Sequence, residues 1–341
     1  MTNTSDYDFT KIPFDRIVKF GQKSMLRKDT FAVSWILGRF CNYNCSYCWP
    51  YAHSRTKDYR PFELVTKTID EIKRQAKANG FNSFHFSFSG GEPTFHPEYL
   101  QILEYLNNGD PTTIHMTSNC SQNLLWFEKY AWVASNFNNA HVTASLHREY
   151  VDTPTKVEAF AQKLRFLIDN KVNTTINIVM VPERFEELYN IALYFHSKNI
   201  NVTLKPQSDE KAQRVVEGYT PDMLDKLHNG FPQRDYRTGL WAEQSFYIEM
   251  YDDQGNPWYI DQAERFNAFN FNKFKGWNCN AGFQSIIIRE PDGNIKRGYS
   301  CADQPLGNIE TGFDLFSKPE PCISQSCVSS ADSKIPKVKH A

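Results

Sequence analysis

The sequence lacks any run of apolar residues long enough to cross a membrane, which takes about 18 to 20 residues. It also lacks a secretory signal, because its start, MTNTSDYDFTKIPFDR, has no basic stretch followed by an apolar one. We therefore expect a soluble, cytoplasmic protein. In that reducing compartment the eight cysteines are expected to be metal ligands or buried thiols, and disulfides are the alternative only if the chain is exported.

A charge excess of either sign is also missing. The 341 residues include 38 lysines and arginines and 39 aspartates and glutamates, which gives a formal net charge of −1. No general attraction to nucleic acid or to an anionic membrane is therefore expected. Hydrophobic residues make up 40% and aromatic residues 15% of the chain, which is enough for one large domain or two smaller ones with a substantial core or an aromatic-lined pocket.

Strand-like and helix-like segments alternate through the first two thirds of the chain, which predicts an α/β protein with a parallel sheet and right-handed crossovers. Six such units fall short of the eight in a closed barrel. Functional groups of these folds gather where strands end. The expected strands are residues 30–37, 83–89, 112–118, 140–147, 173–181 and 201–207, and the expected helices are residues 61–80, 97–109, 123–135, 155–170 and 184–199.

The alternation ends after residue 207, so we expect a second, smaller domain. A short helix is predicted at 221–228, and hairpins are predicted at 246–260 and at 282–301, the second around the turn Pro-Asp-Gly. The irregular, basic end of the chain is expected to fray. The predicted boundaries are an extension at 1–30, an α/β core at 31–207, a linker at 208–245, an α+β domain at 246–330 and a flexible tail at 331–341.

Three cysteines, Cys41, Cys45 and Cys48, lie in the segment RFCNYNCSYCWP after the first expected strand. The polar residues between them are poor helix formers, so we expect a loop. Tetrahedral zinc would need a fourth ligand, such as His53 or a distant cysteine. A four-iron cluster would keep one iron without a protein ligand. The spacing alone leaves both metals open.

Gly-Gly-Glu-Pro follows the second expected strand, in FSFSGGEPTFHPEYL. By itself this segment would be an ordinary turn. Together with the Cys-x3-Cys-x2-Cys loop, which has Tyr47 directly before its last cysteine, it resembles the two signature motifs of the radical SAM superfamily. The resemblance covers roughly residues 31–207. It implies a partial (β/α)6 barrel that holds a [4Fe–4S] cluster and S-adenosylmethionine.

The resemblance also implies a reaction. Cys41, Cys45 and Cys48 would hold three irons, and the fourth iron would bind the amino and carboxylate groups of S-adenosylmethionine. An electron from the reduced cluster, delivered by a donor such as flavodoxin or ferredoxin, would cleave the sulfonium. The resulting 5′-deoxyadenosyl radical would abstract a hydrogen atom from the substrate, while the protein positions and shields the cofactors.

Several residues are expected to contact S-adenosylmethionine if the resemblance holds. Gly90 and Gly91 have no Cβ and would let the main chain approach the methionine moiety. Glu92 would accept a hydrogen bond from its ammonium group, and Pro93 would stiffen the turn. Tyr47 would lie near the adenine, although a lone aromatic residue is more often part of a core.

The ends of the third and fourth expected strands carry further candidates. Ser118 and Asn119, in Thr-Ser-Asn, resemble the end of the family's third strand. Ser145, in Ala-Ser-Leu-His, resembles a fourth-strand serine that contacts ribose. Many relatives have an aspartate two residues after that serine, whereas this chain has His147. The polar contacts of this region therefore depart from the family pattern.

Four more residues have a functional and a structural interpretation. Arg148 or Lys156 would pair with the carboxylate of S-adenosylmethionine, or be solvated surface charges. Val179 would pack on the adenine or belong to the core of its strand. Cys120 would donate a hydrogen atom to a substrate radical, or be a buried thiol, which is the commoner case.

A second group of cysteines is formed by Cys279, Cys301, Cys322 and Cys327. Their order, with a hairpin after the first and Leu-Gly-Asn-Ile after the second, resembles the C-terminal SPASM domain and its shortened form, twitch. Four cysteines would hold one auxiliary [4Fe–4S] cluster that transfers electrons. The last pair has four intervening residues where two are common, and a structural zinc site is the alternative.

Relatives with such domains modify peptide or protein side chains, or oxidise small molecules such as aminocyclitols. Residues 1–30 are too few for the leader-binding domain of many peptide-modifying members. We therefore expect an oxidation or rearrangement of a small molecule or a peptide side chain, with the auxiliary cluster as an electron relay. The alternatives are a peptide-crosslinking or epimerising enzyme with a separate leader-binding partner, and a non-catalytic iron–sulfur or zinc protein on a degenerate barrel.

Overall fold

The computed structural model divides the chain into two compact units. The terminal unit consists of Met1–Ser34, Lys67–Phe84 and Gln244–Ala341, and the parallel-sheet unit consists of Trp35–Thr66 and His85–Glu243. Strand β2 (Thr30–Ile36), helix α2 (Phe62–Ala78) and strand β3 (Ser83–Ser89) begin in one unit and continue into the other. The structure describes residues 9–26, 28–49, 52–210, 214–234, 241–242, 248–260, 271–289, 292–301, 305–327 and 329–339.

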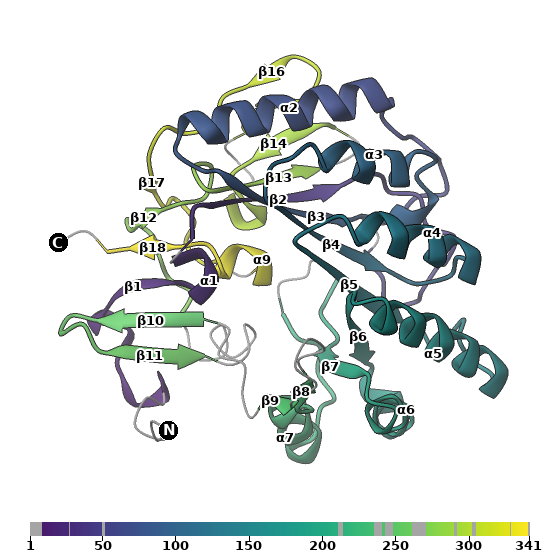
Figure 1. Ribbon diagram of the computed structural model, residues 1–341. Helices are drawn as coiled ribbons and strands as arrows, with labels where there is room; N and C mark the ends of the chain where they lie inside the picture. The colour runs from purple at the N-terminus through teal and green to yellow at the C-terminus, as the bar shows by residue number, and fades with distance from the viewer. Residues whose placement is uncertain are drawn as a thin grey trace. The chain divides into compact units, whose positions relative to one another are not determined.

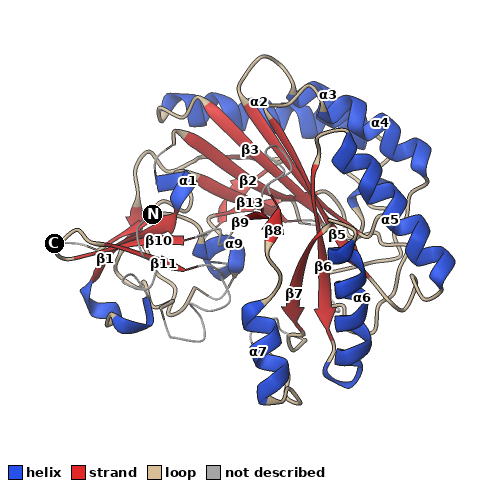
Figure 2. Cartoon of the chain, turned by 60° about the horizontal axis from the view of Figure 1, so that its bottom comes forward, coloured by secondary structure: helices blue, strands red, loops and turns tan. Residues whose placement is uncertain are grey.

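The parallel-sheet unit contains five strands that lie side by side in chain order from β3 to β7, and the pairs from β4 to β7 are parallel (Figure 1). Four helices connect them and lie along one side of the sheet (Figure 2). This arrangement confirms the α/β fold that the alternating pattern predicts. The strands after β3 are β4 (Thr112–Ser118), β5 (Asn139–Leu146), β6 (Asn173–Met180) and β7 (Asn201–Pro206), and the helices are α3 (Tyr99–Leu106), α4 (Leu124–Ala134), α5 (Pro154–Asp169) and α6 (Phe185–Ser197).

The strands form because their apolar residues repeat with a period of two. In β3 the side chains of Phe84, Phe86 and Phe88 are buried, and β6 buries Ile176 and Ile178 in the same alternating way. Successive strand residues point to opposite faces, so one face of the sheet becomes apolar. Two of the helices begin at polar caps: the side chains of Asn123 and Thr153 accept hydrogen bonds from the main chain at the starts of α4 and α5.

The other face of these strands is half-buried and polar, and we call it the polar face. A chain of hydrogen bonds crosses it: Ser87 Oγ lies 2.7 Å from His115 Nδ1, and His115 Nε2 lies 2.8 Å from Thr143 Oγ1. Polar side chains on this face satisfy one another and offer further donors and acceptors to a ligand. The polar face consists of His85, Ser87, Thr113, His115, His141, Thr143, Ser145, Asn173, Thr175 and Asn177.

Beyond β7 the parallel-sheet unit contains the predicted short helix, α7 (Pro221–Asn229). The region predicted as a linker also holds a small antiparallel ribbon of β8 (Gln233–Arg234) and β9 (Trp241–Ala242). None of the helices that the structure describes has both the length and the apolar character of a membrane span.

The terminal unit contains a six-stranded sheet in the order β11-β10-β1-β18-β12-β17. The first and last strands of the chain are neighbours in it, with Lys19 opposite Val338 (Figure 1). The extension at 1–30 and the flexible tail at 331–341 are therefore wrong as predicted, because both segments supply strands. The strands are β1 (Ile17–Gln22), β10 (Ile248–Asp252), β11 (Pro257–Ile260), β12 (Asn278–Cys279), β17 (Glu320–Pro321) and β18 (Lys337–Val338).

Both predicted hairpins are present in the terminal unit. Strands β10 and β11 form the first, and β13 (Ser285–Arg289) and β14 (Asn294–Lys296) form the second. The pair continues into β15 (Pro305–Asn308) and β16 (Gly312–Phe313). The first residue of the predicted Pro-Asp-Gly turn lies outside the described residues. Short helical segments of this unit are η2 (Phe9–Lys11), η3 (Phe14–Arg16), α1 (Lys23–Leu26), η6 (Tyr299–Cys301) and α9 (Ser330–Ser333).

Candidate active site and second cysteine group

The first three cysteines lie in a loop directly after β2, in the parallel-sheet unit. Cys45 is buried, and Cys41 and Cys48 are half-buried. Burial, together with negative charge on Glu149, Cys48 and Cys41, raises the pKa of Cys45 to about 12. The three sulfurs are therefore close enough to influence one another. Three thiolates in one buried loop repel each other, and a bound metal group would offset that repulsion, so the donor set fits an iron–sulfur cluster.

Hydrogen bonds to the loop fix the position of Cys41. The main-chain N–H of Tyr43 donates to Cys41 Sγ at 3.4 Å, and Asn119 Nδ2 lies 3.8 Å from the same sulfur. Asn119 Nδ2 also donates to Asn42 Oδ1 at 2.9 Å. The end of β4 therefore holds the start of the cysteine loop, and N–H donors at the sulfur stabilise a thiolate. His53, the candidate fourth zinc ligand, has its Nε2 2.9 Å from Asn44 Oδ1.

The Gly-Gly-Glu-Pro turn continues the pairing of β2 and β3 beyond the ends of the strands. Gly91 N donates to Gly38 O at 3.0 Å, and Glu92 N donates to Phe40 O at 2.7 Å. A Cβ at Gly90 would lie 2.1 Å from Gly38 O, and one at Gly91 would lie 2.3 Å from Phe40 O. The two glycines are thus required for contact with the protein's own main chain. An approach to the methionine moiety, as the sequence suggests, is not needed to explain them.

Glu92 joins the ends of β3 and β4. Its side chain is 1% exposed and accepts hydrogen bonds from Thr94 Oγ1 at 2.7 Å, from Ser118 Oγ at 2.8 Å and from Asn119 N at 2.6 Å. Burial raises the pKa of this carboxyl, and the hydrogen bonds oppose that shift. Pro93 is buried at the start of the short helical turn η4 (Pro93–Phe95). Four predicted residues, Glu92, Pro93, Ser118 and Asn119, therefore lie together beside Cys41.

Tyr47 forms a hydrogen bond with His147, the residue that stands where the family pattern has an aspartate. Its hydroxyl lies 2.9 Å from His147 Nδ1, and the two rings stack with 5.9 Å between centroids. Burial lowers the pKa of His147 to about 4, so the ring is neutral near pH 7, and burial raises the pKa of Tyr47. The Tyr47 hydroxyl and the neutral imidazole of His147 therefore share one hydrogen bond at Nδ1.

Three residues that the sequence did not indicate also hold the cysteine loop. Glu149 accepts a hydrogen bond from Ser46 N at 3.0 Å, and the Tyr150 hydroxyl accepts one from Asn44 N at 2.5 Å. The ring of Tyr43 stacks on that of Tyr150 at 3.9 Å. The position of Glu149 and Tyr150 directly after β5 was the only available signal, because functional side chains gather at strand ends.

Tyr59 is a further residue that the sequence did not indicate. Its hydroxyl is buried and forms no hydrogen bond. Burial, together with negative charge on Glu92 and Cys41, raises the pKa of Tyr59 to about 12. The ring packs against His96 with 4.9 Å between centroids. An unpartnered buried donor beside Cys41 is a feature expected of a ligand site.

The remaining predicted cofactor residues lie at different places. Ser145 is on the polar face opposite Asn177, and Val179 is half-buried farther along β6. Arg148 Nε donates to Glu187 at 3.1 Å, and Lys156 Nζ donates to Asp152 at 2.7 Å. Both cations are therefore engaged with carboxylates of the protein.

Cys120 is completely buried at the end of β4. Its backbone has φ of 52°, in the left-handed region, and Lys163 Nζ donates a hydrogen bond to its carbonyl oxygen. Burial raises the pKa of the Cys120 thiol to about 12. These features agree with the buried-thiol alternative, and a substrate radical has no exposed sulfur to reach at this position.

The second cysteine group lies in the terminal unit, where Cys279, Cys301, Cys322 and Cys327 are all less than 9% exposed. Burial raises the pKa of Cys301 to about 12, with further increases from Asp332, Cys279 and Cys322. Cys279 and Cys301 likewise raise the pKa of Cys327. These influences indicate that the four thiols lie near one another, and Cys279, Cys322 and Cys327 belong to one apolar core cluster.

Buried polar side chains support the segments that carry these cysteines. Arg297 is 2% exposed and donates to Ala281 O at 3.1 Å and to Pro321 O at 3.2 Å, which are near Cys279 and Cys322. The Asp332 carboxylate accepts from Tyr299 N at 3.0 Å and from Ser300 N at 2.5 Å, directly before Cys301. Arg297 therefore supports the segments around Cys279 and Cys322, and Asp332 supports the segment before Cys301.

In the described parts of the chain, no three His, Cys, Asp or Glu side chains are placed to hold a single metal ion.

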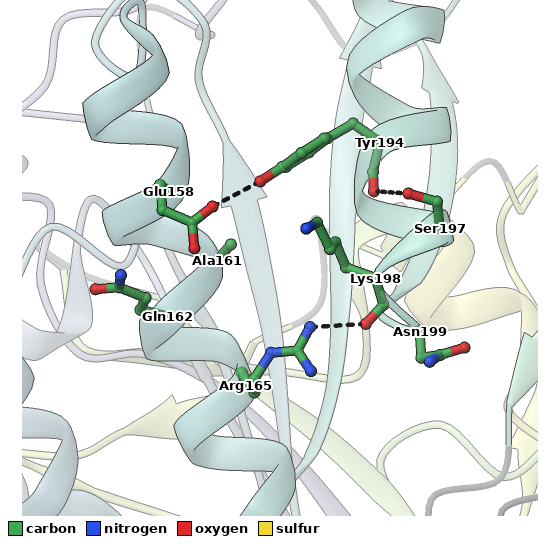
Figure 3. Close-up of a pocket in the computed structure, with 8 residues that line it drawn as sticks. All are labelled: Glu158, Ala161, Gln162, Arg165, Tyr194, Ser197, Lys198 and Asn199. Carbon is green, nitrogen blue, oxygen red and sulfur yellow. Dashed lines mark hydrogen bonds between the residues drawn. The ribbon is translucent and has the colours of Figure 1, made fainter.

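A separate cleft of about 460 Å³ lies between α5 and α6, on the helix side of the sheet (Figure 3). Across it the Tyr194 hydroxyl donates to Glu158 at 2.7 Å, and Arg165 donates to the carbonyl oxygen of Lys198 at 3.0 Å. These lining residues bond to one another, and the cleft contains none of the strand-end residues described above. It is therefore not part of the candidate site.

Comparisons with known proteins agree with the motifs. Residues 35–195 match the family model of the Radical SAM superfamily. Among solved structures, a histidine-tagged anSMEcpe with bound AdoMet is 14% identical, with a TM-score of 0.55 over 83% of this chain and 79% of that chain. Native anSMEcpe with bound AdoMet and Cp18Cys peptide is also 14% identical, with a TM-score of 0.51 over 83% of this chain and 78% of that chain.

No curated protein matches the sequence. At 14% identity, the likeness to the solved structures concerns the fold. The family model, however, spans the cysteine loop, the Gly-Gly-Glu-Pro turn and the strand ends that surround them. Residues 35–195 thus form a radical SAM domain, the domain of a superfamily of enzymes.

Proposed function

We propose that the chain is a radical SAM enzyme that abstracts a hydrogen atom from a polar substrate. The observation that carries this proposal is the group of Cys41, Cys45 and Cys48 at the end of β2, with the Gly-Gly-Glu-Pro turn bonded beside it. Cys41, Cys45 and Cys48 would hold a [4Fe–4S] cluster, whose chemistry would be the one-electron reductive cleavage of S-adenosylmethionine to methionine and a 5′-deoxyadenosyl radical, with the electron supplied by a donor such as reduced flavodoxin or ferredoxin.

The chain's own residues would orient the cofactors. The N–H groups at Cys41 Sγ fix this sulfur and favour its thiolate form. Three protein thiolates leave one iron for the amino and carboxylate groups of S-adenosylmethionine. Tyr47 and the buried Tyr59 hydroxyl lie near the cysteines, so we assign Tyr47 to the adenine and Tyr59 to a polar group of the cofactor. The contact of Glu92 with the ammonium group stays a prediction.

The substrate class follows from the polar face of the sheet. Its hydroxyl, amide and imidazole groups suit a ligand that forms many hydrogen bonds, such as a small polyhydroxylated molecule or a peptide side chain. A peptide is supported by native anSMEcpe, a protein of similar fold whose structure holds a Cp18Cys peptide. We propose oxidation or rearrangement of such a substrate, and crosslinking or epimerisation of a peptide delivered by a separate partner is the second candidate.

We further propose that Cys279, Cys301, Cys322 and Cys327 bind an auxiliary [4Fe–4S] cluster that relays electrons. Four buried thiols that lie near one another support a metal group with four protein ligands, and zinc is the competing occupant. Anaerobic reconstitution should then give about eight irons per chain, four for each cluster. About four irons together with one zinc would refute the auxiliary cluster.

The test of the main proposal is the formation of 5′-deoxyadenosine. Reconstituted protein is mixed with S-adenosylmethionine and dithionite, and the nucleoside is quantified by chromatography. We expect formation by the wild type and by Cys120→Ala, a matched cysteine variant outside the loop, and none by Cys48→Ala. If the wild type with full iron sites forms no nucleoside and does not bind S-adenosylmethionine, the proposal fails.

A further inference from the structure

Lys337 is a cation buried in the core of the terminal unit. Its side chain lies on β18, it is 1% exposed, and β18 pairs with β1 on one side and β12 on the other. In that pairing Lys337 is directly opposite Phe20 and opposite Cys279. A lysine in the middle of a sheet, next to a candidate metal ligand, requires an explanation, because lysine is almost never fully buried without a partner.

The hydrogen bonds of Lys337 do not supply a counter-charge. Nζ donates to the main-chain oxygens of Asp332 and Ile335, each at 2.8 Å. The ammonium also lies 4.9 Å from the centroid of the Phe274 ring. Within the residues that the structure describes, no carboxylate forms an ion pair with Lys337. Burial of an ammonium without an opposite charge is strongly unfavourable, so a further anionic partner is expected.

The sulfurs of the second cysteine group are the anionic partner that the structure offers. Cys279, Cys322 and Cys327 belong to the same apolar cluster of buried side chains as Phe20 and Phe274, whose rings lie under the ammonium. In an apolar core, opposite charges attract more strongly than at the surface. Four thiolates around a metal group carry a net negative charge, which would balance the cation.

Asp332 is a weaker counter-charge than the sulfurs: burial lowers the pKa of Lys337, and negative charge on Cys327 and Cys279 raises it more than negative charge on Asp332 does. Its carboxylate accepts hydrogen bonds from Tyr299 N and Ser300 N, on the segment that leads to Cys301. Only its main-chain oxygen bonds to Lys337. Arg297 is a second buried cation, but it donates to main-chain oxygens near Cys279 and Cys322, which is a scaffolding role. The charges of Arg297 and Lys337 both act on sulfurs of this group, and Lys337 is the cation that lies opposite Cys279 in the sheet.

We infer that Lys337 is the counter-cation of the metal group bound by Cys279, Cys301, Cys322 and Cys327, and that it raises the reduction potential of an auxiliary [4Fe–4S] cluster there. The inference rests on the auxiliary cluster of the proposed function. Uptake of one electron, from a substrate radical or from the external donor, adds one negative charge to the cluster. A fixed positive charge beside it stabilises the reduced form more than the oxidised form. Lys337 thus makes this cluster a better electron acceptor.

The test uses the full chain with Cys41, Cys45 and Cys48 replaced by alanine, so that only the second site can hold iron. Iron is counted, and the midpoint potential is measured by redox titration followed by electron paramagnetic resonance. We expect Lys337→Met to lower the reduced-to-oxidised ratio at a fixed potential at least tenfold, a shift of about 59 mV for one electron. Lys337→Arg should stay near the parent, and so should Lys339→Met, an exposed lysine two residues away.

The possible outcomes distinguish the claim that an auxiliary cluster is present from the claim that Lys337 raises its reduction potential. If the parent holds zinc in place of iron, the auxiliary cluster fails and the inference fails with it. If four irons are present and Lys337→Met titrates at the parent's potential, the cluster stands and the inference is overturned. If Lys337→Met loses its iron, the iron contents of Lys337→Gln and Lys337→Arg are compared. Iron kept only by the arginine variant supports the role of Lys337 as counter-cation. Loss of iron in all three variants overturns it.

Discussion

The hydroxyl of Tyr47 and Nδ1 of His147 are 2.9 Å apart, and this contact joins the cysteine loop to the end of β5. A neutral imidazole stands where many members of the superfamily have an aspartate, so Tyr47 is held by a group without charge. The tyrosine ring is thereby fixed beside Cys45, whose charge affects its pKa. This hydrogen bond and the stacking of the two rings orient Tyr47 through a residue far away in the sequence.

Tyr47→Phe removes that hydrogen bond and keeps the ring. We expect a loss of about 1 to 3 kcal/mol in unfolding free energy, because Nδ1 of the buried His147 loses its partner. Affinity for S-adenosylmethionine should change little in Tyr47→Phe and fall about tenfold in Tyr47→Ala, which also loses the ring. Urea unfolding and calorimetry measure the two effects. Wild-type affinity in Tyr47→Ala would show that the ring does not face the cofactor.

Tyr59→Phe tests whether the unpartnered hydroxyl belongs to the cofactor site. The stability of the protein without cofactor should not fall, because no hydrogen bond within the protein is removed. Affinity for S-adenosylmethionine should fall by about 1 kcal/mol, the usual contribution of one hydrogen bond. Tyr130→Phe is the matched control, because the Tyr130 hydroxyl is also buried without a partner but belongs to helix α4. Equal affinities of the two variants would remove Tyr59 from the site.

Gly91→Ala tests the close approach of the main chain at the Gly-Gly-Glu-Pro turn. The added Cβ would lie 2.3 Å from the carbonyl oxygens of Arg39 and Phe40, so the end of β3 must separate from the loop after β2. We expect a loss of more than about 2 kcal/mol in urea unfolding, as for other overpacked sites. Gly80→Ala is the control, because its Cβ meets open space and only its φ of 90° causes strain. A smaller loss in Gly91→Ala than in Gly80→Ala would contradict the steric argument.

His96 should make the protein less stable in mild acid. Burial lowers its pKa to about 4, whereas an unfolded histidine has a pKa of about 6.5. The unfolded chain therefore binds a proton that the native protein excludes, and stability is lost as the pH falls from 6.5 toward 4. The loss between pH 7 and pH 5 is about 2 kcal/mol for this residue.

His96→Asn can still accept the hydrogen bond that His96 Nδ1 receives from Glu98 N. The variant should lose about 2 kcal/mol less than the wild type between pH 7 and pH 5 when both are unfolded in urea without metal. An identical pH dependence of the two proteins would mean that His96 is protonated in the native state.

The sequence predicts the parallel-sheet unit well because its signals are local. Phe84, Phe86 and Phe88 alternate with polar residues, and the predicted strand at 83–89 has the same bounds as β3. Strand β1 escapes prediction because its burial is irregular, with a register shift between Ile17 and Lys19 that interrupts the period of two. The pattern of one strand alone cannot reveal such a segment, since its partners β10 and β18 are distant in sequence.

The candidate site likewise contains residues that a sequence pattern predicts and residues that no sequence pattern predicts. The cysteines, the Gly-Gly-Glu-Pro turn and the strand-end residues have recognisable spacing. Tyr59 and Glu149 have none, because their role comes only from contacts formed in the folded chain. The charge of the basic end of the chain predicts a tail, yet Lys337 is buried there. The sulfurs that would balance this charge lie elsewhere in the sequence.

The place of β18 between β1 and β12 has a consequence for the order of folding. Lys19 pairs with Val338, and Cys279 pairs with Lys337, so the middle of this sheet closes only after residue 338 has been synthesised. Pairings this distant in sequence form slowly, and until then neighbouring strand edges stay open. Metal insertion at the second cysteine group would therefore be one of the last steps in the maturation of this unit, after β18 has paired with β1 and β12.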